Sequence, residues 1–106
     1  MNPKTKAIVT ELRKYLERLY GERLMQIVVF GSQARGDAVE GSDIDILVAL
    51  KGSVSPGMEI ARTSETTAAL SLKHNLVISC TFVSADRYTT EQSPLFINVR
   101  REGVTL

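Results

Sequence analysis

The 106-residue sequence has one cysteine, a formal net charge of only +1 and no long apolar run. The lone Cys80 has no second thiol for an internal disulfide, which is typical of a reducing compartment, so we expect a cytoplasmic location and interpret Cys80 as a buried strand residue. A balanced charge does not provide the basic surface that general nucleic-acid binding needs, so a nucleic-acid partner is disfavoured. No segment approaches the roughly 20 apolar residues that span a bilayer, so we expect no membrane association.

The composition, 43% hydrophobic and 24% charged, is that of a small globular protein. We expect a single domain over residues 1–106 with an α/β (α+β) core. Apolar residues at helical spacing predict a long first helix that ends at Gly21, and two apolar runs predict an antiparallel pair of strands. The expected elements are helices over about 4–20, 32–35, 58–73 and 95–101, the last ended by Gly103, and strands over about 24–30, 43–49 and 76–83.

Residues 31–45 form the most informative segment and lie between the two apolar runs. Gly31 and Ser32 follow the first predicted strand, where free backbone N–H groups can face a phosphate. Asp43 and Asp45 are two residues apart on the second strand, so their side chains point to one face. Two neighbouring like charges repel each other unless a cation lies between them, and Mg²⁺ is the natural candidate because it binds carboxylate, water and phosphate oxygens.

Each of these features also has an ordinary structural interpretation. Gly31–Ser32 fits a strand-to-helix turn with a serine cap, and the aspartate pair fits a solvated strand face. Arg35 is expected either to contact phosphate or to brace the loop by pairing with a nearby acid. Ser42 is interpreted as a turn residue, and Asp37 and Glu40 as solvated charges. Together, between two strands, the turn and the aspartate pair favour a metal and phosphate site.

Gly31-Ser32, ten intervening residues and then Asp43-x-Asp45 resembles the signature of the DNA polymerase β-like nucleotidyltransferases. The stretches 32–36 and 42–48 are similar to the minimal prokaryotic branch of that family, and the resemblance covers nearly the whole chain. It implies a small mixed, mainly antiparallel sheet of three or four strands flanked by helices, which we expect on one side. It also implies that the turn holds the triphosphate of ATP or another nucleoside triphosphate, and that the catalytic aspartates bind up to two Mg²⁺ ions.

The sequence departs from the resemblance at a third carboxylate, which in the family lies on a later strand and activates the attacking hydroxyl. The matching stretch is Leu76–Val83, where Ser79 takes the place of the acid and no Asp or Glu occurs. A serine is neutral near pH 7 and a poor proton acceptor. Three accounts stay open: an acid such as Asp86 or Glu91 enters from the following loop, the substrate or a partner supplies the group, or the chain binds nucleotide without efficient turnover.

The function implied by the resemblance is transfer of a nucleoside monophosphate, AMP from ATP, to a hydroxyl, with pyrophosphate leaving. The chain is too short for a large acceptor-recognition domain, so we expect the acceptor on another protein. The resemblance implies a small helical partner of the HEPN type in a toxin–antitoxin pair, with this domain as the antitoxin that modifies a partner tyrosine. The alternatives are an attenuated module that binds nucleotide and partner, and a purely structural subunit. The oligomeric state stays open.

Several segments outside the motif also carry predictions. Lys51–Gly57 is predicted to be a mobile loop that borders the nucleotide. His74 is interpreted as a surface or helix C-terminal residue, because no second histidine or suitably spaced cysteine accompanies it as a zinc ligand. The Tyr88–Phe96 region is a candidate partner contact. The helix over 58–73 is predicted to bury Ile60, Ala61, Ala68, Leu70 and Leu72, and Arg100, Arg101 and Glu102 are predicted to form a solvated helix end.

Overall fold

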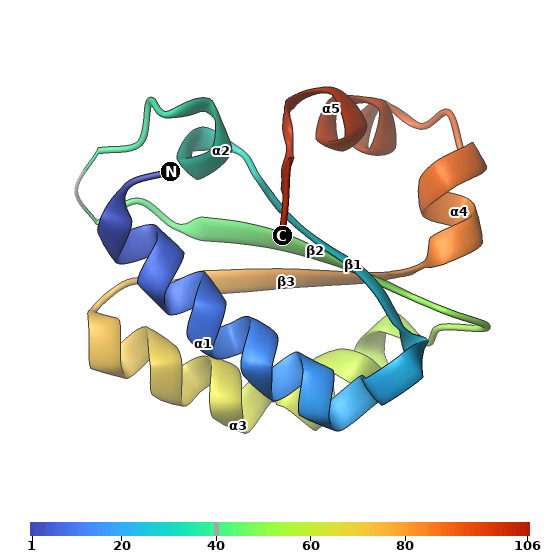
Figure 1. The fold of residues 1–106 in the computed structure, drawn as a ribbon, viewed down its shortest axis with the longest axis horizontal. Helices are drawn as coiled ribbons and strands as arrows, with labels where there is room; N and C mark the ends of the chain where they lie inside the picture. The colour runs from blue at the N-terminus through green and yellow to red at the C-terminus, as the bar shows by residue number, and fades with distance from the viewer. Residues whose placement is uncertain (40) are drawn as a thin grey trace.

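A computed structural model describes residues 1–39 and 41–106 (Figure 1), so Glu40, interpreted above as a solvated charge, lies outside the described residues. Each element predicted from the sequence is present, and the structure adds α4, β4 and the short 3-10 turn η1. The elements in chain order are α1 (Pro3–Tyr20), η1 (Gly21–Arg23), β1 (Leu24–Phe30), α2 (Ser32–Arg35), β2 (Ile44–Leu50), α3 (Pro56–His74), β3 (Ile78–Ser84), α4 (Ala85–Thr90), α5 (Pro94–Glu102) and β4 (Val104–Thr105).

The four strands form one sheet in the order β3-β2-β1-β4. β1 is antiparallel to both β2 and β4, whereas β2 and β3 are parallel. Parallel neighbours need a long connection, and α3 supplies it between β2 and β3. The mixed, mainly antiparallel sheet is therefore confirmed, with β3 and β4 as its two edges.

Helices cover both faces of the sheet, so the expectation of helices on one side is wrong. α1 and α3 lie below the sheet in Figure 1, and α4 and α5 lie on the other side. Along β2, Ile46 packs into the core between the sheet and helices α1 and α3. Leu47 packs into a second core on the opposite face, with Tyr88 and Phe96. Both faces are covered because β2 is an almost continuous apolar run, which is typical of a strand buried on both sides.

The predicted helix ends are confirmed by their backbone geometry. Gly21 follows α1 with a φ of +55° and donates its N–H to the carbonyl of Glu17, as a C-terminal cap does. Ser93 caps the start of α5 by accepting a hydrogen bond from the N–H of Phe96, and Gly103 follows its last residue. No helix in the described ranges is long and apolar enough to cross a membrane.

The buried face of α3 differs from the prediction. Leu70 is buried as expected, but the other buried residues are Glu59 and Thr63, while Ile60 is 49% exposed and Leu72 84% exposed. The Glu59 carboxylate accepts hydrogen bonds from the Tyr20 hydroxyl (2.6 Å) and the Arg62 Nε (3.1 Å), so its burial is compensated. Ala61 and Ala68, also predicted to be buried, are exposed.

The region from Tyr88 to Phe96 has buried aromatic residues at its two ends, whereas most residues between them are exposed, so its interpretation as a partner contact stays a prediction. The rings of Tyr88 and Phe96 are buried and meet edge to face, with 6.1 Å between their centroids. The prediction of a solvated helix end is wrong for Arg100. Its guanidinium donates hydrogen bonds to the carbonyls of Tyr88 and Glu91 and so connects α5 to the end of α4. Arg101 is exposed, as predicted.

Candidate functional site

The structure brings the glycine turn and the aspartate pair together. Phe30, the last residue of β1, pairs with Asp45 in the antiparallel register. Gly31 follows with a φ of +73°, a conformation that L side chains rarely adopt. A Cβ atom at Gly31 would lie 2.6 Å from Oδ2 of Asp45, so only glycine lets the backbone pass this close to the carboxylate.

The turn leads directly into the single-turn helix α2. Gly31 occupies the position before the helix, and its carbonyl accepts the N–H groups of Ala34 and Arg35. No side chain caps α2, so the serine-cap interpretation of Ser32 is wrong. Ser32 is instead the first residue of the helix, where backbone N–H groups have no partner within the helix itself. These N–H groups are the donors that a phosphate near Gly31 would use.

Asp43 immediately precedes β2 and Asp45 is the second residue of that strand, so the alternation along the chain places both on the face of the sheet that carries Leu47. Asp43 is exposed and Asp45 is partly buried. Burial, and then the charge of Asp43, raise the pKa of the Asp45 carboxyl above its usual value. A divalent cation between the two carboxylates would offset both effects. The donor set therefore fits Mg²⁺, which accepts two carboxylates when waters and substrate phosphate oxygens complete its coordination.

Ser79 lies directly beside Asp45, because the two residues are partners in the parallel register of β2 and β3. The third acid does not come from the following segment either, since the described residues contain no group of three His, Cys, Asp or Glu side chains able to hold a metal. Asp86 and Glu91 follow the opposite end of β3 from Ser79, and the Glu91 carboxylate pairs with Arg87. The account in which one of them completes the site is wrong for the described structure.

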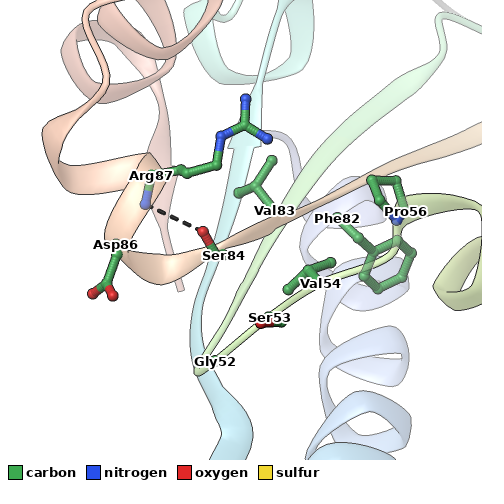
Figure 2. Close-up of a pocket in the computed structure, with 9 residues that line it drawn as sticks. All are labelled: Gly52, Ser53, Val54, Pro56, Phe82, Val83, Ser84, Asp86 and Arg87. Atoms are coloured by element: carbon green, nitrogen blue, oxygen red, sulfur yellow. Dashed lines mark hydrogen bonds between the residues drawn. The ribbon is translucent and has the colours of Figure 1, made fainter.

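The loop after β2 does not border the aspartate pair, contrary to the prediction. It follows Leu50, at the end of β2 opposite Asp45, and Pro56 already belongs to α3. Arg23 donates to the carbonyls of Lys51 and Ser53, each at 3.2 Å. Figure 2 shows this loop beside the far end of β3, where it lines a cavity of about 460 Å³.

Arg35 pairs with two acids. Its Nε lies 3.1 Å from Asp37 and its Nη1 lies 3.7 Å from Glu102 at the end of α5. The geometry is that of the loop brace, one of the two roles expected for this residue. Ser42 is the expected turn residue, because its hydroxyl accepts the N–H of Val39. His74 is the last residue of α3, as expected.

Sequence reasoning missed Gln33, which is 5% exposed. Its Oε1 accepts a hydrogen bond from the Thr5 hydroxyl at 2.8 Å, and its Nε2 donates to the carbonyl of Ser42 at 3.2 Å. Gln33 therefore joins α1, α2 and the residue before Asp43. A glutamine between a serine and an alanine carries no local signal of this role, since its partners are 28 and 9 residues away.

A mixed sheet that holds a glycine turn against an aspartate pair defines the nucleotidyltransferase class. Comparison with known proteins agrees. The family described as "Nucleotidyltransferase domain" matches residues 9–84. The protein named "Putative protein adenylyltransferase MJ0604" from Methanocaldococcus jannaschii is 34% identical over 99 residues, which cover 92% of this chain and 93% of that one. The chain belongs to the nucleotidyltransferase domain family, as the resemblance of its motif implied.

Solved structures share the fold. The chain superposes on the solved structure described as "Structure of putative minimal nucleotidyltransferase" with a TM-score of 0.61 and 27% identity. The match covers 100% of this chain and 97% of that one. "Crystal structure of the toxin-antitoxin with AMP-PNP" gives a TM-score of 0.62 at 23% identity, covering 98% of this chain and 72% of that one. At 23% identity, the second structure supports the fold alone.

Proposed function

We propose that this protein transfers AMP from ATP to a hydroxyl group of a partner protein. Asp43 and Asp45 are the proposed catalytic metal ligands, and Gly31 and Ser32 are the proposed triphosphate site. Arg35, at the end of the same helix, is proposed to exchange its exposed pairs with Asp37 and Glu102 for the triphosphate when ATP binds. The main observation behind the proposal is that the backbone of Gly31 lies very close to the Asp45 carboxylate. A Cβ atom built at Gly31 would lie 2.6 Å from Oδ2 of Asp45. A phosphate on the turn and a cation on the aspartates would then be neighbours.

In the proposed step, the acceptor hydroxyl oxygen attacks the α-phosphorus of ATP and forms a new oxygen–phosphorus bond. The bond from that phosphorus to the bridging oxygen breaks, pyrophosphate leaves, and the hydroxyl proton passes to water. Bound Mg²⁺ supplies neutralisation of the developing charge. Gly31 and Ser32 would orient the leaving phosphates through their N–H groups, and Asp43 and Asp45 would hold the metal ion beside the triphosphate.

A protein acceptor is favoured by the relative named as a protein adenylyltransferase, and by the toxin–antitoxin complex that shares the fold. We therefore propose a helical partner of the HEPN type, with this chain as the antitoxin and a tyrosine hydroxyl as acceptor. The single cysteine and the need for ATP are consistent with a cytoplasmic pair.

The test is incubation of the purified protein with α-³²P-labelled ATP, MgCl₂ and the proposed HEPN-type partner protein. Label on the partner, lost in Asp45→Asn and retained in Glu22→Gln, supports the proposal. Glu22 is a suitable control because it is an exposed acid on η1, at the other end of β1 from Gly31. Absence of magnesium-dependent ATP binding, with or without the partner, would overturn it in favour of a structural subunit.

The second candidate is an attenuated module that binds nucleotide and partner without efficient transfer. It is favoured by the placement of Ser79 beside Asp45, where a carboxylate would complete the metal site. ATP binding without label on the partner would support this candidate. A sharp rise of transfer in Ser79→Asp would show that the natural protein is attenuated at this position, and no change would indicate that the missing group comes from elsewhere.

A further inference from the structure

β3 forms an edge of the sheet, and half of its backbone groups face outward. The carbonyl of Val77 accepts a hydrogen bond from the N–H of Ile44. In a parallel pair, every second residue of a strand bonds to the same neighbour, so the backbone groups of Ser79 and Thr81 face β2. Cys80 and Phe82 direct theirs to the free edge. Among the described residues, only the Ser71 hydroxyl reaches this edge, where it accepts the N–H of Ile78 at 3.2 Å.

The free edge lacks the charged side chains and prolines that often prevent pairing with another chain. β3 reads Ile-Ser-Cys-Thr-Phe-Val-Ser over residues 78–84, without a charge or a proline. Charged side chains and prolines are the usual means by which an edge strand is blocked. An uncharged, regular edge of seven residues is therefore open to a further strand.

Two hollows follow one another along β3. The first, of about 380 Å³, lies between α3 and β3, and every residue that lines it is uncharged, including Ile60, Ala68 and Cys80. The second is the cavity of about 460 Å³ in Figure 2, lined by residues 82–84 at the far end of the strand. The inverted burial of α3, with Glu59 inside and Ile60 outside, places apolar surface in the first hollow.

The edge leads directly to the aspartate pair. Asp45 and Ser79 are register partners, so a residue added beside Ser79 on the free edge would share their face of the sheet. Two strand spacings separate its Cα from that of Asp45 by about 10 Å. Because Ser79 is small, a long hydroxyl side chain such as tyrosine can extend over it towards the aspartates.

We propose that the free edge of β3 binds an extended segment of the acceptor protein as a fifth strand, and that this segment carries the reacting hydroxyl over Ser79 to Asp43 and Asp45. Outward backbone groups are matched by another extended chain, which identifies the occupant as polypeptide. The uncharged hollow requires uncharged side chains at the alternate positions that face α3. The inference rests on the proposed transfer reaction and names its docking mode.

The test compares Ala68→Arg with Ala69→Arg. Both alanines are exposed on α3, but of the two only Ala68 lines the hollow. The two variants therefore add the same charge to the same helix, one inside the proposed site and one outside it. The probe is the proposed HEPN-type partner protein. We expect Ala68→Arg to weaken its binding by about tenfold or more, which is at least about 1.4 kcal/mol, and to leave magnesium-dependent ATP binding unchanged. Ala69→Arg should match the wild type in both.

Hydrogen exchange supplies the second measurement. The amides of Cys80 and Phe82 should become protected when the partner binds, whereas those of Ser79 and Thr81 are already bonded within the sheet. Equal partner binding by Ala68→Arg and the wild type, or no protection at Cys80 and Phe82, overturns the docking mode, as does failure of the wild type to bind the partner. Protection that grows with protein concentration without partner identifies a second copy of this chain as the occupant and also overturns it.

Failure of the docking mode and failure of the proposed function give different results. If the wild type binds ATP with magnesium and labels the partner while Ala68→Arg binds that partner normally, only the docking mode fails. If no magnesium-dependent ATP binding occurs, the transfer reaction fails whatever the edge binds.

Discussion

The side-chain amide of Gln33 donates a hydrogen bond to the carbonyl of Ser42, 3.2 Å away. Gln33 belongs to the helix that follows the glycine turn, and Ser42 immediately precedes Asp43. The hydroxyl of Thr5, on α1, donates to the same glutamine at 2.8 Å. One buried side chain thus fixes the spacing between the turn and the aspartate pair.

Replacement of Gln33 by alanine should reduce both stability and binding of magnesium and ATP. Loss of a buried polar partner leaves the Thr5 hydroxyl unsatisfied, at a cost of about 1–3 kcal/mol. Thr5→Val should reproduce part of this loss in urea denaturation. Its matched control is Thr10→Val, because Thr10 is exposed on the same helix and bonds only to its own helix. Equal losses in Thr5→Val and Thr10→Val would contradict the role given to Gln33.

Gly31→Ala should abolish magnesium-dependent ATP binding, whereas Gly36→Ala should retain it. Both glycines have positive φ angles, +73° and +80°, so both variants carry backbone strain of about 1–2 kcal/mol. Only at Gly31 does the new Cβ meet the Asp45 carboxylate, and at Gly36 it meets nothing within 4 Å. The pair of variants separates strain from contact with the carboxylate. ATP titration in MgCl₂ is the measurement, and similar binding by both variants would be evidence against the site.

Asp43→Asn should slightly stabilise the metal-free protein and remove its stabilisation by Mg²⁺. The charge of Asp43 contributes to the raised pKa of Asp45. Because Asp43 is exposed, removing its charge should increase the free energy of unfolding by only about 0.3 kcal/mol. In the wild type, Mg²⁺ at 100 times its dissociation constant should add about 2.7 kcal/mol. Thermal unfolding with and without MgCl₂ measures both effects. Glu22→Gln should keep the magnesium-dependent shift, and a shift retained by Asp43→Asn would exclude this residue as a ligand.

Tyr20→Phe should destabilise the protein by about 1–3 kcal/mol, because Glu59 is then left buried with Arg62 alone. The same pair predicts a pH effect. Burial and the hydrogen bond to Glu59 raise the pKa of Tyr20 above 10.0, so above that pH the unfolded chain loses a proton that the folded chain retains. The free energy of unfolding of the wild type therefore falls as the pH rises past 10, and that of Tyr20→Phe falls less.

Urea denaturation at about pH 8 and about pH 10.5 measures this difference across the range where the unfolded tyrosine ionises. Tyr15→Phe, on the same helix, is the control for the loss of a tyrosine hydroxyl. A pH dependence of Tyr20→Phe that parallels the wild type would show that Tyr20 does not cause the decline.

The Cys80 thiol should react slowly in the native protein. Burial raises its pKa from 9.0 to about 11, which lowers the thiolate fraction near neutral pH by about a hundredfold. Alkylation by iodoacetamide, followed by mass spectrometry, should therefore be slow in the folded chain and fast after denaturation. Cys80→Ser is the blank for this reaction. Cys80 is partly buried, whereas the sequence predicted a buried residue. Equally fast labelling of folded and denatured protein would show that the fold does not shield its thiol.

The elements whose signals are local could be predicted from the sequence. α1 has apolar residues at helical spacing before Gly21, and the apolar runs of β1 and β2 have the length and composition of buried strands. The metal and phosphate site could be proposed from the sequence because glycine and serine suit a phosphate-binding turn, aspartates suit a cation, and the two occur at a fixed spacing. The sequence by itself therefore determined the main helices and strands, the helix ends and the candidate residues of the site, whereas the mixed sheet was expected from the resemblance of the motif.

Only the tertiary structure decided which surfaces meet. Glu59 is buried in place of Ile60 because Tyr20, 39 residues away, satisfies its carboxylate. Gln33 gained its role from partners on two other segments, and helices cover both faces because α5 returns the chain across the sheet. The nearness of Gly31 to Asp45, the placement of Ser79 and the free edge of β3 follow from strand order and register. These depend on long-range packing, which no local pattern encodes.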